Sequence, residues 1–451
     1  MSSADVHPSI PVKKQQRRDA STRLNIIIVG AGLGGVGSAI SLLLAGHRVT
    51  IFEAASQIAE IGAGIQILPN SSRVLQSWGM RGLLEPVATK PSRVNMWGWK
   101  GNMITYVDTE KSAAEYPGTF YWDFHRANLH TALLRRASEL GVQLKINARV
   151  VDVRIASDEA EDATVVLDSG EEFVADLVVG ADGINSRMRE VLMGRPDPPI
   201  PTGDLAYRLL LNAEDVLKDP ELAHFIKQPQ VNYWIGPDAH AVNYVLKGGK
   251  LFNMVLIVPD DMPFGGANTL QGDVDEMRAH FKGWDPKILK LLELCGSVRK
   301  WRLRIRTGMD DWSHPSGAFT MLGDAVHATL PYLASGAGMC LEDAAVLGEL
   351  FSRAPNPKDP RTKKQLLKIY ENCRKERTEM VVQRGNLQQW LYHLPDGPEQ
   401  EERDRKMRVA EEGEAMVMRD SGLAPQLLGY QVEKNIDQYW PVVEMQETAR
   451  M

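Results

Sequence analysis

Residues 24–53 constrain the fold more than any other part of this chain. Residues 24–29 form a continuous apolar run rich in isoleucine, which is typical of a parallel strand buried on both faces. The run leads directly into G-A-G-L-G-G at residues 30–35, which fits the pattern G-x-G-x-x-G. Residues 36–45 then have the small and aliphatic spacing of a helix packed on a sheet, and a second short strand ends at Glu53. The sequence therefore predicts a strand, turn, helix and strand in close succession.

Each part of this unit has a role in binding a dinucleotide. Gly30 permits the tight turn, Gly32 lets the backbone approach a pyrophosphate, and Gly35 allows close packing of helix on strand. The helix N-terminus attracts the negative charge of the phosphates. Glu53 lies where a carboxylate binds the ribose hydroxyls of an adenosine, and it would repel a 2′-phosphate. FAD or NAD is therefore favoured over NADP at this site.

Composition excludes several classes of protein. A chain of 451 residues is long enough for about two or three fused domains. Its net charge of −6 gives no bulk attraction to nucleic acid or to an anionic membrane surface. The three cysteines, Cys295, Cys340 and Cys373, are too scattered for a disulfide framework or a zinc site. A reducing, intracellular location, the cytoplasm, is expected.

Two segments could be mistaken for targeting or membrane signals. Residues 1–22 are polar and contain a basic cluster, but they lack the apolar core of a secretory signal, so a disordered tail is expected. Residues 24–46 are apolar enough to suggest a membrane span. Because five glycines interrupt this run between positions 30 and 37, a strand and helix are favoured, and no stable membrane insertion is expected.

Three further turns follow in order along the chain. Residues 61–65 form a second glycine turn, which could fold back over a bound cofactor or be a plain turn. Asp182 and Gly183 follow a buried strand, and here a simple turn with Ser186 as a helix cap explains the residues equally well. The third turn, at Gly323 and Asp324, precedes glycines at 336 and 338 and a helix at 340–350. This helix N-terminus would also attract an anion.

The three ordered motifs, at 30–35, 182–183 and 323–324, resemble those of the single-component FAD-dependent aromatic hydroxylases, the group A flavoprotein monooxygenases. The resemblance covers residues 23–351. It is greatest to the salicylate-hydroxylase branch and to fungal relatives that hydroxylate polyketide-derived phenols in secondary metabolism. It implies an α/β (α+β) fold, with a Rossmann-like FAD-binding domain of the glutathione-reductase and para-hydroxybenzoate-hydroxylase type. An inserted, mainly antiparallel β-sheet substrate domain and a helical C-terminal region complete this fold.

The expected domain boundaries follow from the motifs and from a proline-rich crossing at 196–201. They are a discontinuous FAD-binding domain at 23–200 and 301–355, a substrate domain at 201–300 and a helical region at 356–451.

The resemblance also assigns roles to individual residues. FAD would be held by Gly30, Gly32, Gly35, Glu53, Ala63, Gly64, Arg126, Asp182, Gly183, Asp324, Ala337 and Gly338. Within this set, Arg126 would reach the pyrophosphate side, and Asp324 would bind the ribityl or pyrophosphate region. Backbone N–H groups near Ala337 and Gly338 would face the isoalloxazine.

The implied chemistry is oxygen transfer to a phenol. NADH or NADPH would reduce FAD, and O2 would then form a flavin C4a-hydroperoxide in a site that excludes water. A cation beside the phenol oxygen favours the reactive phenolate, and Arg208 is the candidate. Tyr233 is the candidate that positions the substrate, and Tyr207 and Tyr244, which are nearby in the sequence, are alternatives for this role. His327 is a further candidate, as a general base. Decarboxylative, ortho and dearomatising hydroxylation all remain open.

Other functions remain open as well. The same fold could serve as a redox sensor or as an escort-type binding module, and the W-G-W-K segment at 97–100 superficially suggests a flavin halogenase. The expected partners are a small phenolic substrate and O2, with the chain acting as a monomer or a homodimer.

Overall fold

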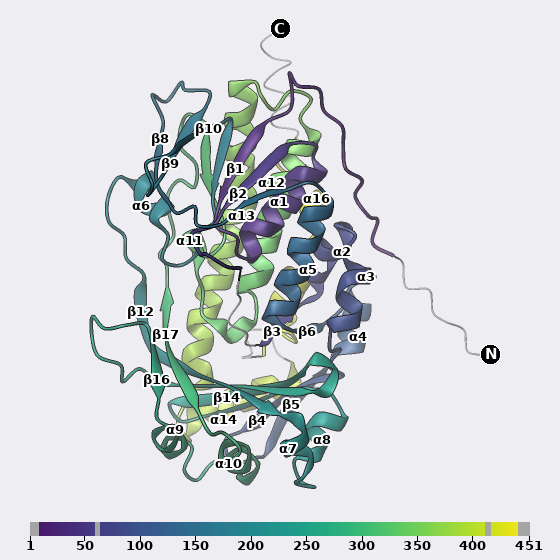
Figure 1. Cartoon of the computed structure of the whole chain (residues 1–451). Helices are drawn as coiled ribbons and strands as arrows, with labels where there is room; N and C mark the ends of the chain where they lie inside the picture. Colours follow the sequence, from purple (N-terminus) through teal and green to yellow (C-terminus); the bar gives the residue numbers. More distant parts are fainter. Residues whose placement is uncertain (1–8, 59–63, 411–415, 441–451) are drawn as a thin grey trace, which may run out of the picture.

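The structure is a computed structural model that describes residues 9–58, 64–410 and 416–440. A five-stranded parallel sheet forms its upper part in Figure 1. Its strands, in spatial order, are β18 (Phe319–Met321), β11 (Leu177–Gly180), β1 (Asn25–Val29), β2 (Arg48–Phe52) and β7 (Gln143–Lys145). Helices α1 (Leu33–Leu44), α5 (Arg126–Glu139) and α12 (Gly336–Arg353) belong to the same layered unit. The strand and helix expected from residues 24–45 are therefore confirmed.

A second, eight-stranded sheet lies below the first in Figure 1. Its spatial order is β16 (Thr269–Gly272), β17 (Val298–Ile305), β12 (Ile200–Asn212), β15 (Leu251–Pro259), β14 (Ala239–Leu246), β13 (Val231–Gly236), β4 (Arg93–Gly98) and β5 (Met103–Asp108). Pairing is antiparallel throughout except between β13 and β4, which are parallel. The expected fold class, a Rossmann-like sheet with a mainly antiparallel substrate sheet and a helical C-terminal region, is confirmed.

The two faces of the large sheet pack against different parts of the molecule. One face buries Leu205, Tyr207 and Leu209 in an apolar cluster that includes Met277 and Ile288. Those last two residues lie on α9 (Val274–His280) and α10 (Pro286–Glu293), and α7 (Ala213–Leu217) and α8 (Ala223–Lys227) add to the same cluster. Because side chains alternate along a strand, the intervening residues of β12 point to the opposite face, toward the parallel sheet.

Smaller elements complete the structure. Strands β8 (Val150–Arg154), β9 (Ala163–Leu167) and β10 (Glu172–Ala175) form the expected antiparallel meander, and β3 (Gly64–Ile67) pairs with β6 (Trp122–His125). The remaining helices are α2 (Pro69–Ser77), α3 (Arg81–Leu84), α4 (Thr109–Ala114), α6 (Arg187–Met193), α11 (Asp324–His327), α13 (Pro360–Tyr392), α14 (Pro398–Val409), α15 (Leu423–Leu428) and α16 (Val432–Asp437). None of the helices that the structure describes is both long and apolar enough to cross a bilayer.

Helix α13 connects the two sheets. Near its start, the Tyr370 hydroxyl donates to the backbone oxygen of Met321 on β18, and near its end Gln389 donates to the backbone oxygen of Thr202 on β12. Figure 1 shows this helix running from the parallel sheet down to the large one. The helical C-terminal region therefore closes the space between the sheets.

The expected substrate-domain boundaries need a correction. The expected FAD-binding domain at 23–200 includes residues 93–108, but β4 and β5 belong to the large sheet because Val94 pairs with Val231. Strand β17 likewise continues this sheet to Ile305, past the expected boundary at 300. The first difference arises from a parallel pairing between segments far apart in sequence, which no local pattern reveals.

The expected disordered tail also needs a correction for its described part. Residues 9–22 form neither helix nor strand beyond a turn, yet they lie against α1 and α12. Arg18 donates to the backbone oxygens of Phe351 and Ala354 at the C-terminal end of α12, and Lys13 Nζ lies 2.5 Å from the carboxylate of Glu349. Basic side chains bind the unpaired carbonyls at a helix C-terminus, which explains the placement.

Candidate active site

The first turn of the parallel sheet is shaped for close approach of a ligand. Gly30 has φ of +104°, and a Cβ there would lie 2.5 Å from the backbone oxygen of Ala181. A Cβ on Gly35 would lie 2.0 Å from the backbone oxygen of Gly30, so this glycine is required for packing. Gly32, in contrast, has no atom within 4 Å of the position of its missing Cβ and lines a cavity. It also precedes α1, whose N-terminus has no side-chain cap. The turn thus fits a pyrophosphate.

Glu53 lies beside this turn and is held by it. Its Oε2 accepts a hydrogen bond from the backbone N–H of Ala31, and its Oε1 accepts one from that of Ala55, both at 2.8 Å. A carboxylate has about four lone-pair positions, so Glu53 can still accept bonds from two ribose hydroxyls. The arrangement fits the adenosine side of FAD.

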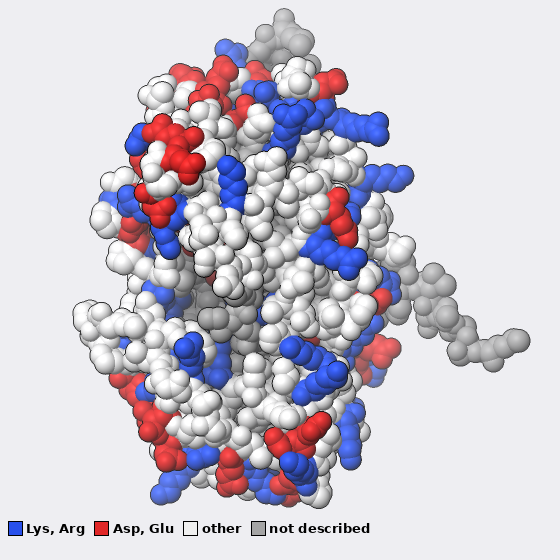
Figure 2. Space-filling view, viewed as in Figure 1, with Lys and Arg blue, Asp and Glu red and all other residues white. Residues whose placement is uncertain are grey.

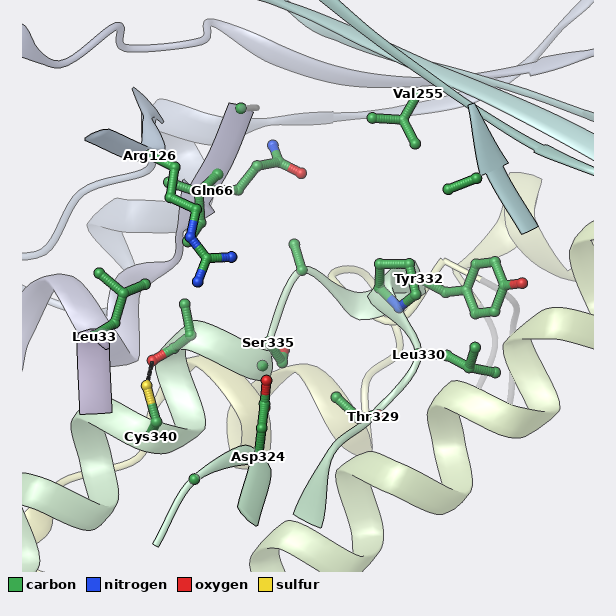
Figure 3. A pocket seen from close by; sticks show the side chains of 18 of the residues that line it. Leu33, Gln66, Arg126, Val255, Asp324, Thr329, Leu330, Tyr332, Ser335 and Cys340 are labelled. Atoms are coloured by element: carbon green, nitrogen blue, oxygen red, sulfur yellow. Dashed lines mark hydrogen bonds between the residues drawn. The ribbon is translucent and has the colours of Figure 1, made fainter. Parts of the chain in front are cut away.

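A cavity of about 320 Å³ lies between the turn and the large sheet. Figure 3 shows Arg126 and Gln66 entering it from one side, Asp324 from another and Val255 from the sheet. Predicted site residues that line it are Gly32, Gly64, Arg126, Gly183, Arg208, Tyr233, Asp324 and Ala337. These residues are spread from position 32 to position 337 of the chain, and the fold brings them to one site.

The second helix N-terminus at the cavity belongs to α12. Its N-cap residue, Ser335, makes no side-chain cap bond and instead donates to the backbone oxygen of Leu333. Ala337 lines the cavity, so the uncapped first turn can donate N–H groups there. Gly338 faces away, because a Cβ on it would meet Asn70 and Ser71 of α2 at 3.4 Å. Together with the exposed Asp324 carboxylate, this end of the cavity fits the flavin half of FAD.

Other predicted cofactor residues have structural roles or lie elsewhere. Asp182 accepts hydrogen bonds from Ser186 Oγ and from the backbone N–H groups of Arg187 and Met188, so it caps α6 and only Gly183 lines the cavity. Gly64 accommodates the ring of Tyr244, which would lie 2.4 Å from a Cβ. Ala63 lies outside the described residues.

His327 points away from the cavity. Its Nε2 lies 2.6 Å from Asp343 Oδ2, which also accepts the backbone N–H of Gly323, while Arg374 binds the other carboxylate oxygen. Burial raises the pKa of Asp343, but His327 and Arg374 outweigh it and hold that pKa at about 2. His327 therefore braces the Gly323 turn against α12 and is not available as a base.

One row of the large sheet faces the cavity with four side chains. Tyr233 pairs with Val242, Val242 with Val255, and Val255 with Arg208, across β13, β14, β15 and β12. All four line the cavity, because direct cross-strand partners point to the same face. Neighbouring strands are about 4.8 Å apart, so Arg208 and Tyr233 stand roughly 14 Å apart at the two ends of an apolar floor.

Arg208 is a desolvated cation. Its guanidinium lies 5.3 Å from the ring centre of Trp301, and among the described residues its Nε has no hydrogen-bond partner. Burial, followed by the nearby Arg126 cation, lowers the pKa of Arg208 from its usual value. A side chain of this kind gains from an anion placed over the floor.

Tyr233 is a buried, neutral hydroxyl. It is 5% exposed, its hydroxyl donates to Gln66 Oε1 at 3.4 Å, and burial raises its pKa well above the ordinary value. Of its two competitors, Tyr244 also lines the cavity, whereas the Tyr207 hydroxyl donates to Glu276 on the opposite face of the sheet.

Sequence patterns missed several residues of the cavity. His240 lies on β14 two positions before Val242, and Gln66, Tyr332 and Ser335 also line the wall. The period-two alternation of His240, Val242 and Tyr244 along one strand was the available signal. It could show a shared face but not which face meets the cavity.

The surface shows no large field of one charge on the face seen in Figure 2, where acidic and basic side chains are interspersed.

Known proteins share this architecture. A family model described as "FAD binding domain" matches residues 23–385. The FAD-dependent monooxygenase OpS4 of Beauveria bassiana (strain ARSEF 2860) is 40% identical over 405 residues, which cover 87% of this chain and 90% of that protein. The 3-hydroxybenzoate 6-hydroxylase of Klebsiella oxytoca is 31% identical and covers 82% of this chain and 89% of that protein.

The fold is also that of a solved salicylate hydroxylase substrate complex, with a TM-score of 0.76 at 23% identity over 93% of this chain and 98% of that one. The relatives are monooxygenases, so an enzyme is supported over a sensor, an escort module or a halogenase. By the family match and by these relatives, the chain belongs to the FAD-dependent aromatic monooxygenases.

Proposed function

We propose that this enzyme hydroxylates a phenolic ring, using one atom of O2 and the electrons of NADH or NADPH. The observation that carries the proposal is the row of four side chains in which an apolar floor, Val242 and Val255, separates Arg208 from Tyr233. A flat ring placed on that floor would have a cation at one end and a neutral hydroxyl at the other.

The cavity residues would each perform one task. Arg208 would attract the phenol oxygen and lower its pKa, which makes the ring a better nucleophile. Tyr233, held by Gln66, would fix the ring's orientation. His240, in the adjacent row with Ile257 and Ala206, would place an imidazole beside the ring. Val242, Val255 and Ile257 would keep water from the reacting atoms.

FAD, when bound, would supply activated oxygen beside the ring. The residues that would hold it are Gly32 and the α1 N-terminus at the pyrophosphate, Glu53 at the ribose, and Asp324 with the α12 N-terminus at the flavin half. We also propose a cytoplasmic location. All three cysteines are free and buried in the structure, and free thiols are typical of a reducing compartment.

Names of similar proteins suggest the substrates to test first. Hydroxybenzoates are named as the substrates of the Klebsiella oxytoca relative and, as salicylate, of the solved neighbour. The resemblance of the three motifs to those of fungal phenol hydroxylases adds phenols of polyketide type to the panel. Whether the product keeps its carboxylate, or loses its aromaticity, depends on how the ring is oriented on the floor.

The test is steady-state oxidation of NADH and of NADPH by the purified, FAD-loaded enzyme, with and without each phenol, followed by mass analysis of products. Oxidation that a phenol stimulates, with a product that gains one oxygen, supports the proposal. FAD-loaded enzyme that forms no oxygenated product from any phenol of the panel, while it reduces O2 to peroxide, contradicts it. Release of carbon dioxide separates decarboxylative from simple hydroxylation.

A further inference from the structure

The cavity wall is connected to the end of α13 through two histidines. His240 on β14 lines the cavity, is 2% exposed, and its Nδ1 lies 2.8 Å from Nε2 of His393, the residue that ends α13. The backbone oxygen of His393 accepts the N–H of Asp238, at the turn between β13 and β14. The pair is therefore held from both the sheet and the helix.

A buried carboxylate lies behind this pair. Asp204 on β12 has its Oδ2 3.8 Å from Nδ1 of His393. The same oxygen accepts hydrogen bonds from the Tyr332 hydroxyl at 2.5 Å and from Gln389 Nε2 at 2.8 Å. Since both partners donate to it, the carboxylate is held as an acceptor, and the His393 ring lies beside the same oxygen.

The arrangement of Asp204, His393 and His240 in a line determines which nitrogen of each imidazole ring carries a proton. Burial lowers the pKa of His393, and burial followed by the His393 ring lowers the pKa of His240 well below the usual value. Each ring therefore carries one proton at neutral pH. The negative Asp204 favours the His393 proton on Nδ1, which leaves Nε2 as an acceptor. His240 must then donate from Nδ1, and its own Nε2 keeps a lone pair.

The other titratable groups around the two histidines do not change this assignment of the ring protons. Tyr332 and Tyr392 place their rings 5.0 and 5.4 Å from the His240 ring. Burial, followed by Asp204, raises the pKa of Tyr332, so its hydroxyl remains a donor to Asp204. Asp238 adds negative charge near His393, which also favours a proton on that ring.

We infer that His393 and Asp204 are positioning residues that hold His240 with its Nε2 as a proton acceptor for the substrate hydroxyl. The inference rests on the proposed function for the identity of the substrate as a phenol. In the proton transfer the phenol O–H bond breaks and an Nε2–H bond forms on His240. The Nδ1 proton of His240 passes to Nε2 of His393, and the resulting imidazolium lies beside the Asp204 carboxylate until it loses a proton to solvent. The end of α13 thus completes the site.

The first experiment measures the tautomer directly and needs no substrate. Nitrogen chemical shifts of histidine-labelled, FAD-loaded enzyme, assigned with a His240→Gln variant, report which ring nitrogen of His240 carries the proton. Protonation at Nδ1 in the wild type is expected, with a shift toward Nε2 or a mixture in Asp204→Asn. Protonation of wild-type His240 at Nε2 would overturn the inference whatever the substrate is.

The second experiment measures ionisation of a bound phenol by its absorbance in the oxidised, FAD-loaded enzyme across pH, without NADH or NADPH. In His393→Leu the midpoint should rise by about one pH unit or more, and turnover at neutral pH should fall at least about ten-fold and recover at high pH. His393→Gln, whose amide oxygen can still accept from His240, should restore the midpoint in part. His314→Gln is the matched control, because this histidine pairs with Asp158 outside the cavity.

The outcomes separate the inference from the proposed function. A wild type that hydroxylates a phenol, together with a His393→Leu enzyme that ionises the phenol at an unchanged midpoint, overturns the role of His393. A wild type that forms no hydroxylated product contradicts the proposed function, and the histidine shifts then still decide the arrangement of the pair.

Discussion

Arg208 and Tyr233 lie in one cross-strand row of the large sheet, with only Val242 and Val255 between them. The row begins at β12 and ends at β13, so it spans four adjacent strands whose order in the sequence is different from their order in space. Opposite this row lie the two uncapped helix N-termini and Asp324. In the proposed function, the sheet would therefore bind the substrate and the turns would bind the cofactor.

Replacement of Arg208 should abolish product formation without loss of FAD. Arg208→Ala removes the desolvated cation at the floor, so kcat/KM for a phenol should fall by about a hundred-fold or more. Arg208→Lys should restore part of it, since the charge remains. FAD absorbance and product yield are measured together, with Arg154→Ala as control because Arg154 pairs with Glu172 at the surface. Near-normal hydroxylation by Arg208→Ala would remove this residue from the proposed site.

Substitution by alanine should have different effects at Gly32 and at Gly35 of the first turn. Gly32→Ala has open space for its Cβ, so the melting temperature should change little while FAD occupancy falls, because the methyl enters the cradle. Gly35→Ala places a Cβ against the Gly30 carbonyl and should destabilise the fold by about 2 kcal/mol or more. Thermal unfolding of the apoproteins and FAD titration measure the two effects. Unchanged FAD affinity in Gly32→Ala would contradict the assigned pyrophosphate position.

Tyr233 and Tyr207 offer a matched pair of hydroxyl deletions. Tyr233→Phe should raise KM for the phenol and increase peroxide formed per NADH or NADPH consumed, because the ring is held less firmly on the floor. Tyr207→Phe loses a bond to Glu276 on the far face and should leave the coupling of reductant to product unchanged. The yields of product and of peroxide per NADH or NADPH consumed measure this coupling in each variant. Equal coupling in both variants would assign the substrate contact to another group, with Tyr244 the next to test.

Asp123 should make stability depend on pH. This buried carboxylate binds Gln66 through Oδ1, and burial raises its pKa to about 7. The folded state therefore holds the proton up to about pH 7, whereas the unfolded chain loses it near pH 4, so stability falls as pH rises through that interval. Asp123→Asn removes the cost, and its advantage in the free energy of unfolding should grow from about pH 4 to pH 7, toward an upper limit of about 4 kcal/mol.

Urea unfolding at about pH 5 and pH 8 measures this difference. Asp168→Asn is the control, since Asp168 is exposed in a turn. A stability difference between Asp123→Asn and wild type that is equal at both pH values would show that the carboxylate does not titrate in this range.

The sequence predicts those parts of the fold that local chemistry determines. The apolar strand, the glycines and Glu53 lie within thirty consecutive residues, and for Gly30 and Gly35 the turn itself supplies the steric reason for a glycine. The roles of Gly338 and Asp182 cannot be predicted in the same way, because a glycine or an aspartate in a turn can have a structural role as well as bind a ligand. In both cases the structure shows a packing or capping role.

Long-range contacts explain most of the rest. The parallel pairing of β4 with β13 joins residues more than a hundred positions apart, and the contact of His240 with His393 depends on the length and direction of α13. The pattern of apolar and polar residues within these segments does not indicate that they are in contact. His240 and Tyr332, which the sequence did not indicate, contact His393 and Asp204 from distant parts of the chain.

In the proposed function, this cavity transfers oxygen from O2 to a phenol bound beside Arg208. The most direct measurement is a single turnover of the FAD-loaded enzyme with reductant, a phenol and isotope-labelled O2, analysed by mass for both wild type and Arg208→Ala. We expect one labelled oxygen atom in the wild-type product and little or no labelled product from the variant, although both enzymes hold FAD. Product without label in the wild type, or equal labelled product from the two enzymes, would contradict it.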